Sequence, residues 1–80
     1  MGQMIGSKGS AETIELLKAL LANYPSQQAA AEESYYSPSY LSLLSKGKRI
    51  ASINFCNWVK TAHPELKRLC TAVQLSRVMD

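Results

Sequence analysis

The stretch from Ser26 to Arg49 constrains the fold of this chain most, because it predicts two short helices joined by a tight turn and followed by a basic loop. The start of the second helix is well marked. Ser37 is a good N-cap, since its hydroxyl can accept from an unpaired backbone N–H, and Pro38 suits the first helical position, where its missing N–H costs nothing. Gly47 can end this helix in a left-handed conformation. Helices this short are not stable alone, so the sequence predicts that others pack against them.

The two helices differ in composition. The first, roughly Gln27 to Ser34, is rich in alanine, which lets another helix approach closely. In the second, Tyr40, Leu41 and Leu44 fall at helical spacing and form one stripe. The other positions of the second helix lie on other faces: Ser39, Ser42 and Leu43.

This stretch resembles the helix-turn-helix of the Cro and phage-repressor (XRE-like) family. That family's pattern begins with Ser-Gln, places Ala five residues after the Ser, has Ser in the recognition helix and closes on Gly followed by basic residues. The resemblance extends over roughly Glu12 to Ala62 and implies an all-α, lambda-repressor-like fold, a compact bundle of about five short helices. The residues that match the pattern without a gap are Ser26, Gln27, Ala31, Ser42, Gly47, Lys48 and Arg49.

The departures from this pattern lie mainly in the turn and in the second helix. Tyr35 stands where the family usually has Gly, so a left-handed conformation there would be costly and a different turn is an open alternative. Ser34 occupies a position that is usually apolar, and Ser45 replaces a frequent acidic residue. Pro38 and Ser39 stand where the family often carries longer base-reading side chains.

Three further helices are predicted around this motif. An amphipathic helix from Ser10, as its cap, to Asn23 should end before Tyr24-Pro25, because the residue before a proline is pushed out of the helical region. Ser52 should cap a fourth helix, with Ile53, Cys56 and Val59 on its inner face and Phe55 partly to the side. Pro64 should begin a fifth helix that continues to Met79. The expected domains are a flexible arm, 1–10, and a helix-turn-helix domain, 11–80.

The charge distribution is more informative than the net charge of +3. Lys46, Lys48 and Arg49 crowd the loop that follows the predicted recognition helix, whereas most acidic residues lie in the first half. A basic triplet is usually only a solvated loop, but this position favours contacts with phosphates. No apolar run is long enough to cross a membrane and no secretory leader is apparent, so we expect a soluble, cytoplasmic protein.

The sequence carries no recognisable catalytic or metal-binding constellation. It has no Ser-His-Asp or Cys-His set and no Gly-rich phosphate loop after a strand, so we expect neither an enzyme nor a cofactor. Cys56 and Cys70 lack ligand partners at metal-site spacing and should be small buried residues. His63, before a proline, is expected to be a helix-boundary residue.

By resemblance, the second helix should enter the major groove of double-stranded DNA as part of a sequence-specific, repressor-like regulator of phage, plasmid or bacterial type that binds as a homodimer. The surplus apolar residues of the last helix suggest the dimer contact, or else packing onto the first helix: Leu75, Val78 and Met79. The residues expected to face bases are Pro38, Ser39, Ser42 and Leu43. The residues expected to contact the DNA backbone are Gln27, Ser37, Tyr40, Lys46, Lys48 and Arg49.

Two other functions remain open at this level. The chain could be a helical protein-interaction module or an antitoxin-like partner-binding protein without strong base readout, with the C-terminal helix as its contact. The grounds are Tyr35 in the turn, Pro38 and serines in place of long polar base readers, and the surplus apolar residues of the last helix. A membrane-facing, matrix-like basic domain would rest on Met1-Gly2, a myristoylation start, but Gly6 replaces the Ser or Thr which that motif requires.

Overall fold

The computed structural model describes residues 10–78, with side chains as far as Ser76. Within this range the chain is all-helical and has no strand, as the sequence predicts. The predicted arm, except for Ser10, and Met79 lie outside the described residues. The elements are α1 (Ser10–Leu21), α2 (Gln27–Ser34), α3 (Pro38–Ser45), α4 (Ile53–Ala62), the single 3₁₀ turn η1 (Pro64–Leu66) and α5 (Lys67–Val78).

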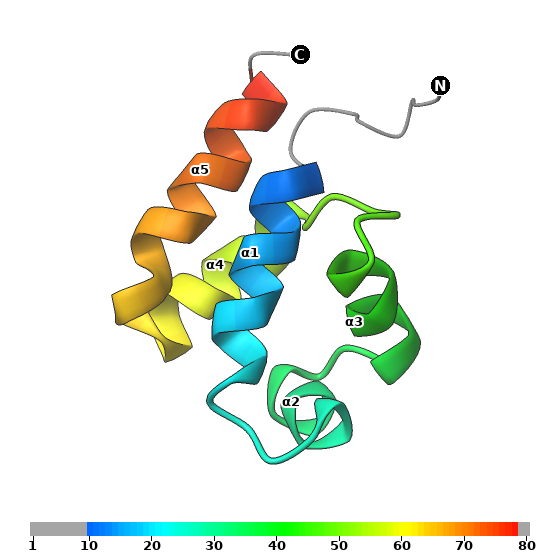
Figure 1. The fold of residues 1–80 in the computed structure, drawn as a ribbon. Helices are drawn as coiled ribbons and strands as arrows, with labels where there is room; N and C mark the ends of the chain where they lie inside the picture. Colours follow the sequence, from blue (N-terminus) through cyan, green and yellow to red (C-terminus); the bar gives the residue numbers. More distant parts are fainter. Residues whose placement is uncertain (1–9, 79–80) are drawn as a thin grey trace.

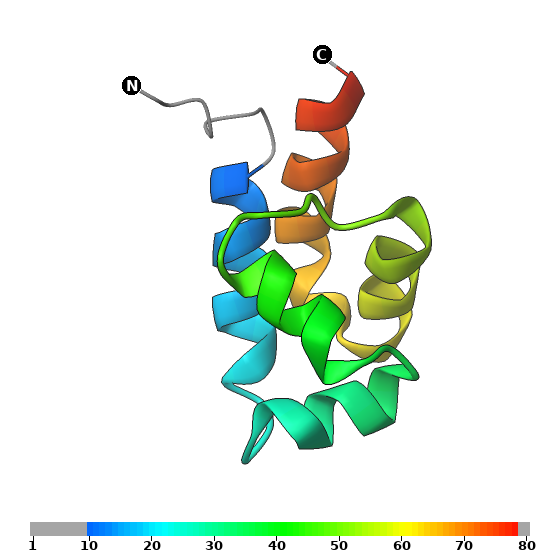
Figure 2. The same ribbon diagram turned by 90° about the vertical axis from the view of Figure 1, so that its right-hand side faces the viewer.

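α1 is the central element of the bundle. It runs antiparallel to α5, so the start of α1 and the end of α5 lie at the same end of the molecule (Figure 1). α3 packs on the other side of α1, and α2 lies at the opposite end from these two helix ends (Figures 1 and 2). No helix among residues 10–78 has the length and apolar character needed to cross a bilayer.

The core is built mainly from leucines at helical spacing. Leu16, Leu17 and Leu20 of α1 are fully buried, and Leu41 and Leu44 of α3 meet them there. Burying a leucine contributes about 1.5–3 kcal/mol, so these five side chains are a principal source of stability. The remaining buried apolar residues are Ala30, Ala31, Ala51, Phe55, Cys56, Val59, Leu66, Cys70 and Val73.

The inner face of α4 differs from the prediction. Phe55 is fully buried, whereas Ile53 is 56% exposed. The Phe55 ring is surrounded by aromatic side chains, with ring centroids of Tyr36 at 5.1 Å and Tyr40 at 5.9 Å. Phe55 therefore joins α4 to the α2–α3 pair, a contact between distant segments that helical periodicity does not reveal.

α1 also fastens the loop that follows α3. The buried Thr13 hydroxyl accepts from the Ala51 N–H at 3.3 Å, and the Ser10 hydroxyl donates to the Gly47 carbonyl at 3.2 Å. Ser10, which was expected to cap the first helix, is the first described residue of α1, and its hydroxyl contacts this loop. These two hydrogen bonds thus hold the loop between α3 and α4 against α1.

The predicted fifth helix is divided into η1 and α5. The division lies between Leu66 and Lys67. His63, the boundary residue, precedes η1, and its N–H closes α4 by donating to the Val59 carbonyl at 2.7 Å. His63 is more than a boundary, since its Nε2 lies 2.7 Å from the Tyr24 hydroxyl and its Nδ1 lies 3.6 Å from a Glu65 carboxylate oxygen. Burial, and to a smaller degree the charge of Glu33, raises the pKa of Tyr24, so the phenol stays protonated.

Cys56 and Cys70 are both fully buried and unoxidised, as the sequence predicts. Burial raises the pKa of the Cys70 thiol to about 11, and the neighbouring Cys56 thiol adds to this effect. Because only the thiolate is a good nucleophile, Cys70 is chemically inert near neutral pH.

The turn between α2 and α3 keeps the left-handed conformation in spite of its tyrosine. Tyr35 has φ 64° and ψ 19°, and it is the single non-glycine residue with positive φ among residues 10–78. Buried Ser34 stabilises this turn, because its hydroxyl donates to the Ala31 carbonyl and accepts from the Tyr36 N–H at 3.3 Å. The left-handed conformation that the sequence analysis regarded as costly for a tyrosine is therefore present at Tyr35.

Replacing Tyr35 by glycine should make the protein more stable. A left-handed non-glycine residue costs about 1–2 kcal/mol, and the 93% exposed Tyr35 side chain recovers little of this by packing. After the extra chain entropy of glycine is subtracted, we expect a gain of about 0.5–1 kcal/mol. Urea denaturation followed by circular dichroism measures it, and an unchanged or lower midpoint would show that the turn is not strained.

Candidate nucleic-acid interface

Side-chain caps define the starts of both helices of the α2–α3 pair. The Ser26 hydroxyl accepts from the Ala29 N–H at 3.1 Å, and the Ser37 hydroxyl accepts from the Tyr40 N–H at 3.1 Å. Pro38 follows Ser37 at the first position of α3, as its sequence position indicates. Pro38 has no N–H, and the Tyr40 and Leu41 N–H groups both donate to Ser37. The Ser39 N–H and the helix dipole are therefore what the start of α3 offers to a phosphate or a base acceptor.

Gln27 links the starts of the two helices. Its side-chain amide donates to the Pro38 carbonyl at 3.0 Å, which holds the first turn of α3 against the first turn of α2. The phosphate contact expected of the same side chain stays a prediction. The hydrogen bond therefore links the starts of the two helices.

The four residues expected to face bases are all accessible to some degree. Pro38 and Ser39 are exposed at the start of α3, while Ser42 and Leu43 are partly exposed further along the helix. Leu41 and Leu44 alternate with them and are buried against α1 and the core. The outer face of α3 is thus short and consists mostly of small side chains.

Tyr40 lies inward and is poorly placed for the backbone contact expected of it. It is half-buried, its ring stacks on Tyr36 with centroids 5.1 Å apart, and its hydroxyl accepts from the Ser52 N–H at 3.2 Å. This hydrogen bond holds the start of α4 against α3. We therefore assign Tyr40 to the packing beneath the α3 surface.

The basic loop leaves α3 through a well-formed C-terminal cap. The Gly47 N–H donates to the Leu44 carbonyl at 3.1 Å and the Lys48 N–H to the Leu43 carbonyl at 2.9 Å, with Gly47 left-handed at φ 74°. This is the Schellman arrangement, which only glycine adopts without strain. It places three exposed cations after the helix: Lys46, Lys48 and Arg49.

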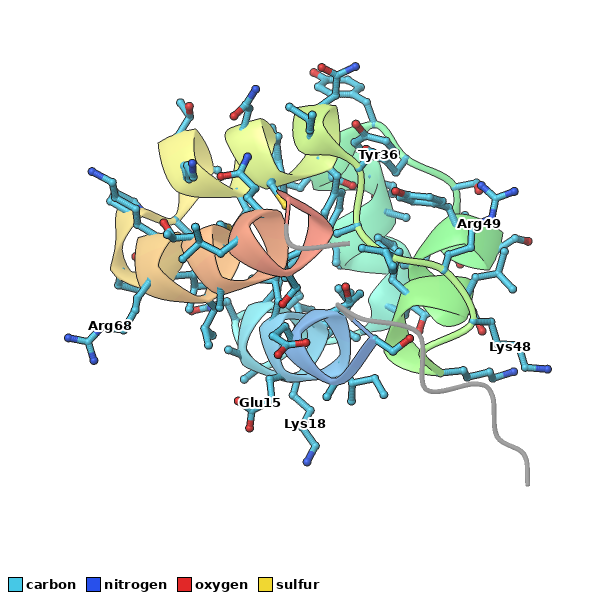
Figure 3. The ribbon with its side chains drawn as sticks, turned by 90° about the horizontal axis from the view of Figure 1, so that it is seen from above. Glu15, Lys18, Tyr36, Lys48, Arg49 and Arg68 are labelled. Atoms are coloured by element: carbon cyan, nitrogen blue, oxygen red, sulfur yellow. The ribbon has the colours of Figure 1, made fainter. Side chains whose placement is uncertain are left out.

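The other charges do not extend this basic surface. Lys48 and Arg49 point outward on one side of the molecule, whereas Arg68 of α5 points away on the opposite side (Figure 3). Glu15 and Lys18 project from α1 on a further face (Figure 3). Exposed Glu32 and Glu33 make the outer side of α2 acidic. Among the side chains that the structure describes, positive charge next to α3 is therefore confined to the loop.

The expected dimer contact can be assessed at one of its three residues. Leu75 is 57% exposed on the outer face of α5. Val78 is the last residue of α5, but its side chain, like Met79, lies outside the described part. Leu75 borders an open, largely apolar depression of about 590 Å³, which is also lined by Pro64, Glu65, Lys67, Arg68, Thr71 and Ala72.

The sequence analysis placed Tyr40 on the apolar stripe of the second helix and also expected it to contact the DNA backbone. Two features of this region had no counterpart in it. One is the hydrogen bond from the Ser52 N–H to the Tyr40 hydroxyl, and the other is a recess beside Tyr35, for which the tyrosine in a glycine position was the available signal. Comparisons with protein-family models, with curated proteins and with solved structures gave no match for this chain. The residues described above are therefore the basis for the function proposed below.

Proposed function

We propose that this protein is a small sequence-specific DNA-binding regulator in which α2 and α3 act as a helix-turn-helix. The observation that carries the proposal is the order of features along α3: a capped, exposed helix start, a small outer face, and a glycine-terminated end followed by three exposed cations. A helix that enters the major groove by its N-terminal end needs such accessible residues at its start and phosphate contacts around it.

Specificity in this proposal depends on few base contacts. Serine hydroxyls can donate or accept, so Ser39 and Ser42 discriminate bases weakly, and Leu43 can contact a thymine methyl. Lys46, Lys48 and Arg49 supply affinity that falls steeply with salt, because phosphate contacts release counterions. The shape of the operator and the spacing of two half-sites would supply much of the remaining specificity.

The test is selection from a random-sequence duplex pool at two salt concentrations, followed by sequencing of the retained DNA. We expect an enriched, roughly palindromic sequence whose binding weakens steeply with salt. In the Lys48→Glu, Arg49→Glu variant, enrichment should disappear. For residual binding, the slope of log affinity against log salt should fall by about 2, since two phosphate contacts are lost.

A matched control separates local contacts from general electrostatics. Lys18→Glu is the control for Lys48→Glu alone, because it changes the net charge by the same amount but at a residue of α1 that projects on another face (Figure 3). This control should retain enrichment and the salt slope. Equal losses in Lys18→Glu and Lys48→Glu, or salt-independent binding, would contradict the proposal.

We propose that the regulator dimerises through α5. The exposed Leu75 beside an apolar depression supports this, because such surfaces on small domains commonly mark protein contacts. Sedimentation velocity should show a dimer that Leu75→Glu converts to monomer with unchanged helicity. If Leu75→Glu remains a dimer, the interface lies elsewhere than at Leu75. If both proteins are monomers, dimerisation takes place only on DNA.

A protein-interaction module is the second candidate function. The observation that favours it is Tyr35, whose nearly complete exposure and strained backbone serve no evident purpose in the fold. Absence of duplex binding in the selection above would favour this second function.

A further inference from the structure

We propose that a recess beside the α2–α3 turn is a docking site for an arginine side chain on a basic segment of a partner protein. The recess has a volume of about 310 Å³. This lies near the lower limit for small-molecule pockets, so it suits one long side chain better than a larger ligand. Its lining residues are Gln28, Ala31, Glu32, Tyr35, Tyr36 and Pro38.

The first argument is the tyrosine at position 35. A glycine there would satisfy the backbone without strain, and the tyrosine ring is too exposed to stabilise the core. Strained residues that persist in a fold are concentrated at binding and switch sites. The ring therefore has more to contribute to a complex than to the folded monomer.

The second argument is the charge of the recess. The carboxylate of Glu32 lines it, Glu33 follows in the chain, and α2 contains no basic residue. A phosphate would be repelled here, whereas a cation would be attracted. Among cations, a guanidinium group both stacks on aromatic rings and forms paired hydrogen bonds with a carboxylate, which favours arginine over lysine.

The third argument is that two walls of the recess are held in place. Tyr36 is held by stacking on Tyr40 and by an edge contact with Phe55, and Pro38 is held by the amide of Gln27. When a ligand binds, it therefore needs to order the exposed side chains of Tyr35 and Glu32 but not these two walls. The molecule's own basic loop does not fill the site, since it follows the last turn of α3 while the recess lies at the first.

The test begins with a displayed random-peptide library, selected on the wild-type protein after depletion on Tyr35→Gly. We expect the retained peptides to share an arginine. Binding of one such peptide, measured by fluorescence anisotropy, should weaken about tenfold in Tyr35→Gly, as expected for the loss of a cation–π contact. Tyr35→Phe keeps the ring and should stay within about twofold of wild type.

Two matched changes test the charge contact. Glu32→Gln should weaken the peptide about tenfold, whereas Glu33→Gln, one residue away and outside the recess, should have little effect. Replacing the peptide arginine by citrulline, which has a similar shape but no charge, should weaken binding at least as much. Because Tyr35→Gly relieves strain, its loss of binding cannot be attributed to unfolding.

Several results would overturn this proposal. One is a selection without arginine, and another is equal loss in Glu32→Gln and Glu33→Gln. A third is concentration-dependent self-association through the recess that Arg49→Glu abolishes, which would make the occupant a second copy of this chain. A fourth is weaker duplex binding by Tyr35→Gly with unchanged peptide binding, which would place Tyr35 in the DNA contact instead.

Discussion

Replacing Phe55 by alanine is expected to lower the free energy of unfolding by about 3–5 kcal/mol, the usual cost of truncating a buried phenylalanine. Phe55 is fully buried and is the common neighbour of three other rings, those of Tyr36, Tyr40 and Trp58. A domain of this size has a total stability of about 4–12 kcal/mol, so the variant should lose much of it. Urea denaturation followed by circular dichroism measures the change.

Ile53→Ala is the control for this experiment, because Ile53 lies on the same helix but is 56% exposed. Its unfolding free energy should differ from that of wild type by less than about 0.5 kcal/mol. Similar losses in the two variants would mean that α4 is rotated about its axis, with Ile53 inward. That orientation is the one which the spacing of Ile53, Cys56 and Val59 predicted.

Replacing Gly47 by alanine should cost about 2 kcal/mol, the second large effect. At φ 74° an alanine is strained by about 1–2 kcal/mol, and its Cβ would lie 2.8 Å from Cδ1 of Ile14, a close contact that the end of the Ile14 side chain must relieve by shifting. The loop also holds Lys46, Lys48 and Arg49, so we expect weaker duplex binding in the same variant.

A double-mutant cycle with Ile14→Ala separates the two causes. Removing the Ile14 side chain abolishes the close contact but not the backbone strain, so Gly47→Ala should cost about 1 kcal/mol in that background. An undiminished cost would show that the strain accounts for the whole effect. Gly47→Asn provides a further check, because asparagine tolerates the left-handed region better than alanine does.

Local signals were sufficient for the individual helices. Ser26, Ser37 and Ser52 each cap a helix through a side-chain hydrogen bond to the N–H three residues ahead. Pro38 begins α3 and Gly47 closes its C-terminal cap. All these effects act within one turn of helix, so residue type and spacing predict them.

What the sequence did not predict depends on contacts between distant segments. Phe55 turns inward because it meets the rings of Tyr36 and Tyr40, and periodicity within one helix does not encode this. Helical spacing placed Tyr40 on the apolar stripe of its helix, but it did not reveal that the Tyr40 hydroxyl accepts from the Ser52 N–H. His63 was expected only at a boundary, but it bonds to Tyr24, thirty-nine residues earlier. At Tyr35, by contrast, the contacts that decide the structure are local. Hydrogen bonds of the neighbouring Ser34 support a left-handed turn that the tyrosine itself disfavours.

The candidate interface was only partly predictable for the same reason. The accessibility of Pro38 and Ser39, and that of the three basic residues, follows from their position in a capped helix and in a loop. The recess at Tyr35 requires the outer side of α2 and the start of α3 to lie together, which the Gln27 contact with Pro38 brings about. That contact joins residues eleven positions apart.

The single tryptophan gives the molecule its own optical reporter. Trp58 is half-buried on α4, with the rings of Phe55 at 6.1 Å and His63 at 5.8 Å, on the part of the bundle that adjoins α5. Its emission wavelength will therefore register loosening around α4 and α5. The tyrosines at the α2–α3 turn absorb and emit at shorter wavelengths. Intrinsic tryptophan and tyrosine fluorescence can thus help to distinguish unfolding around α4 and α5 from binding at the α2–α3 turn without an added label.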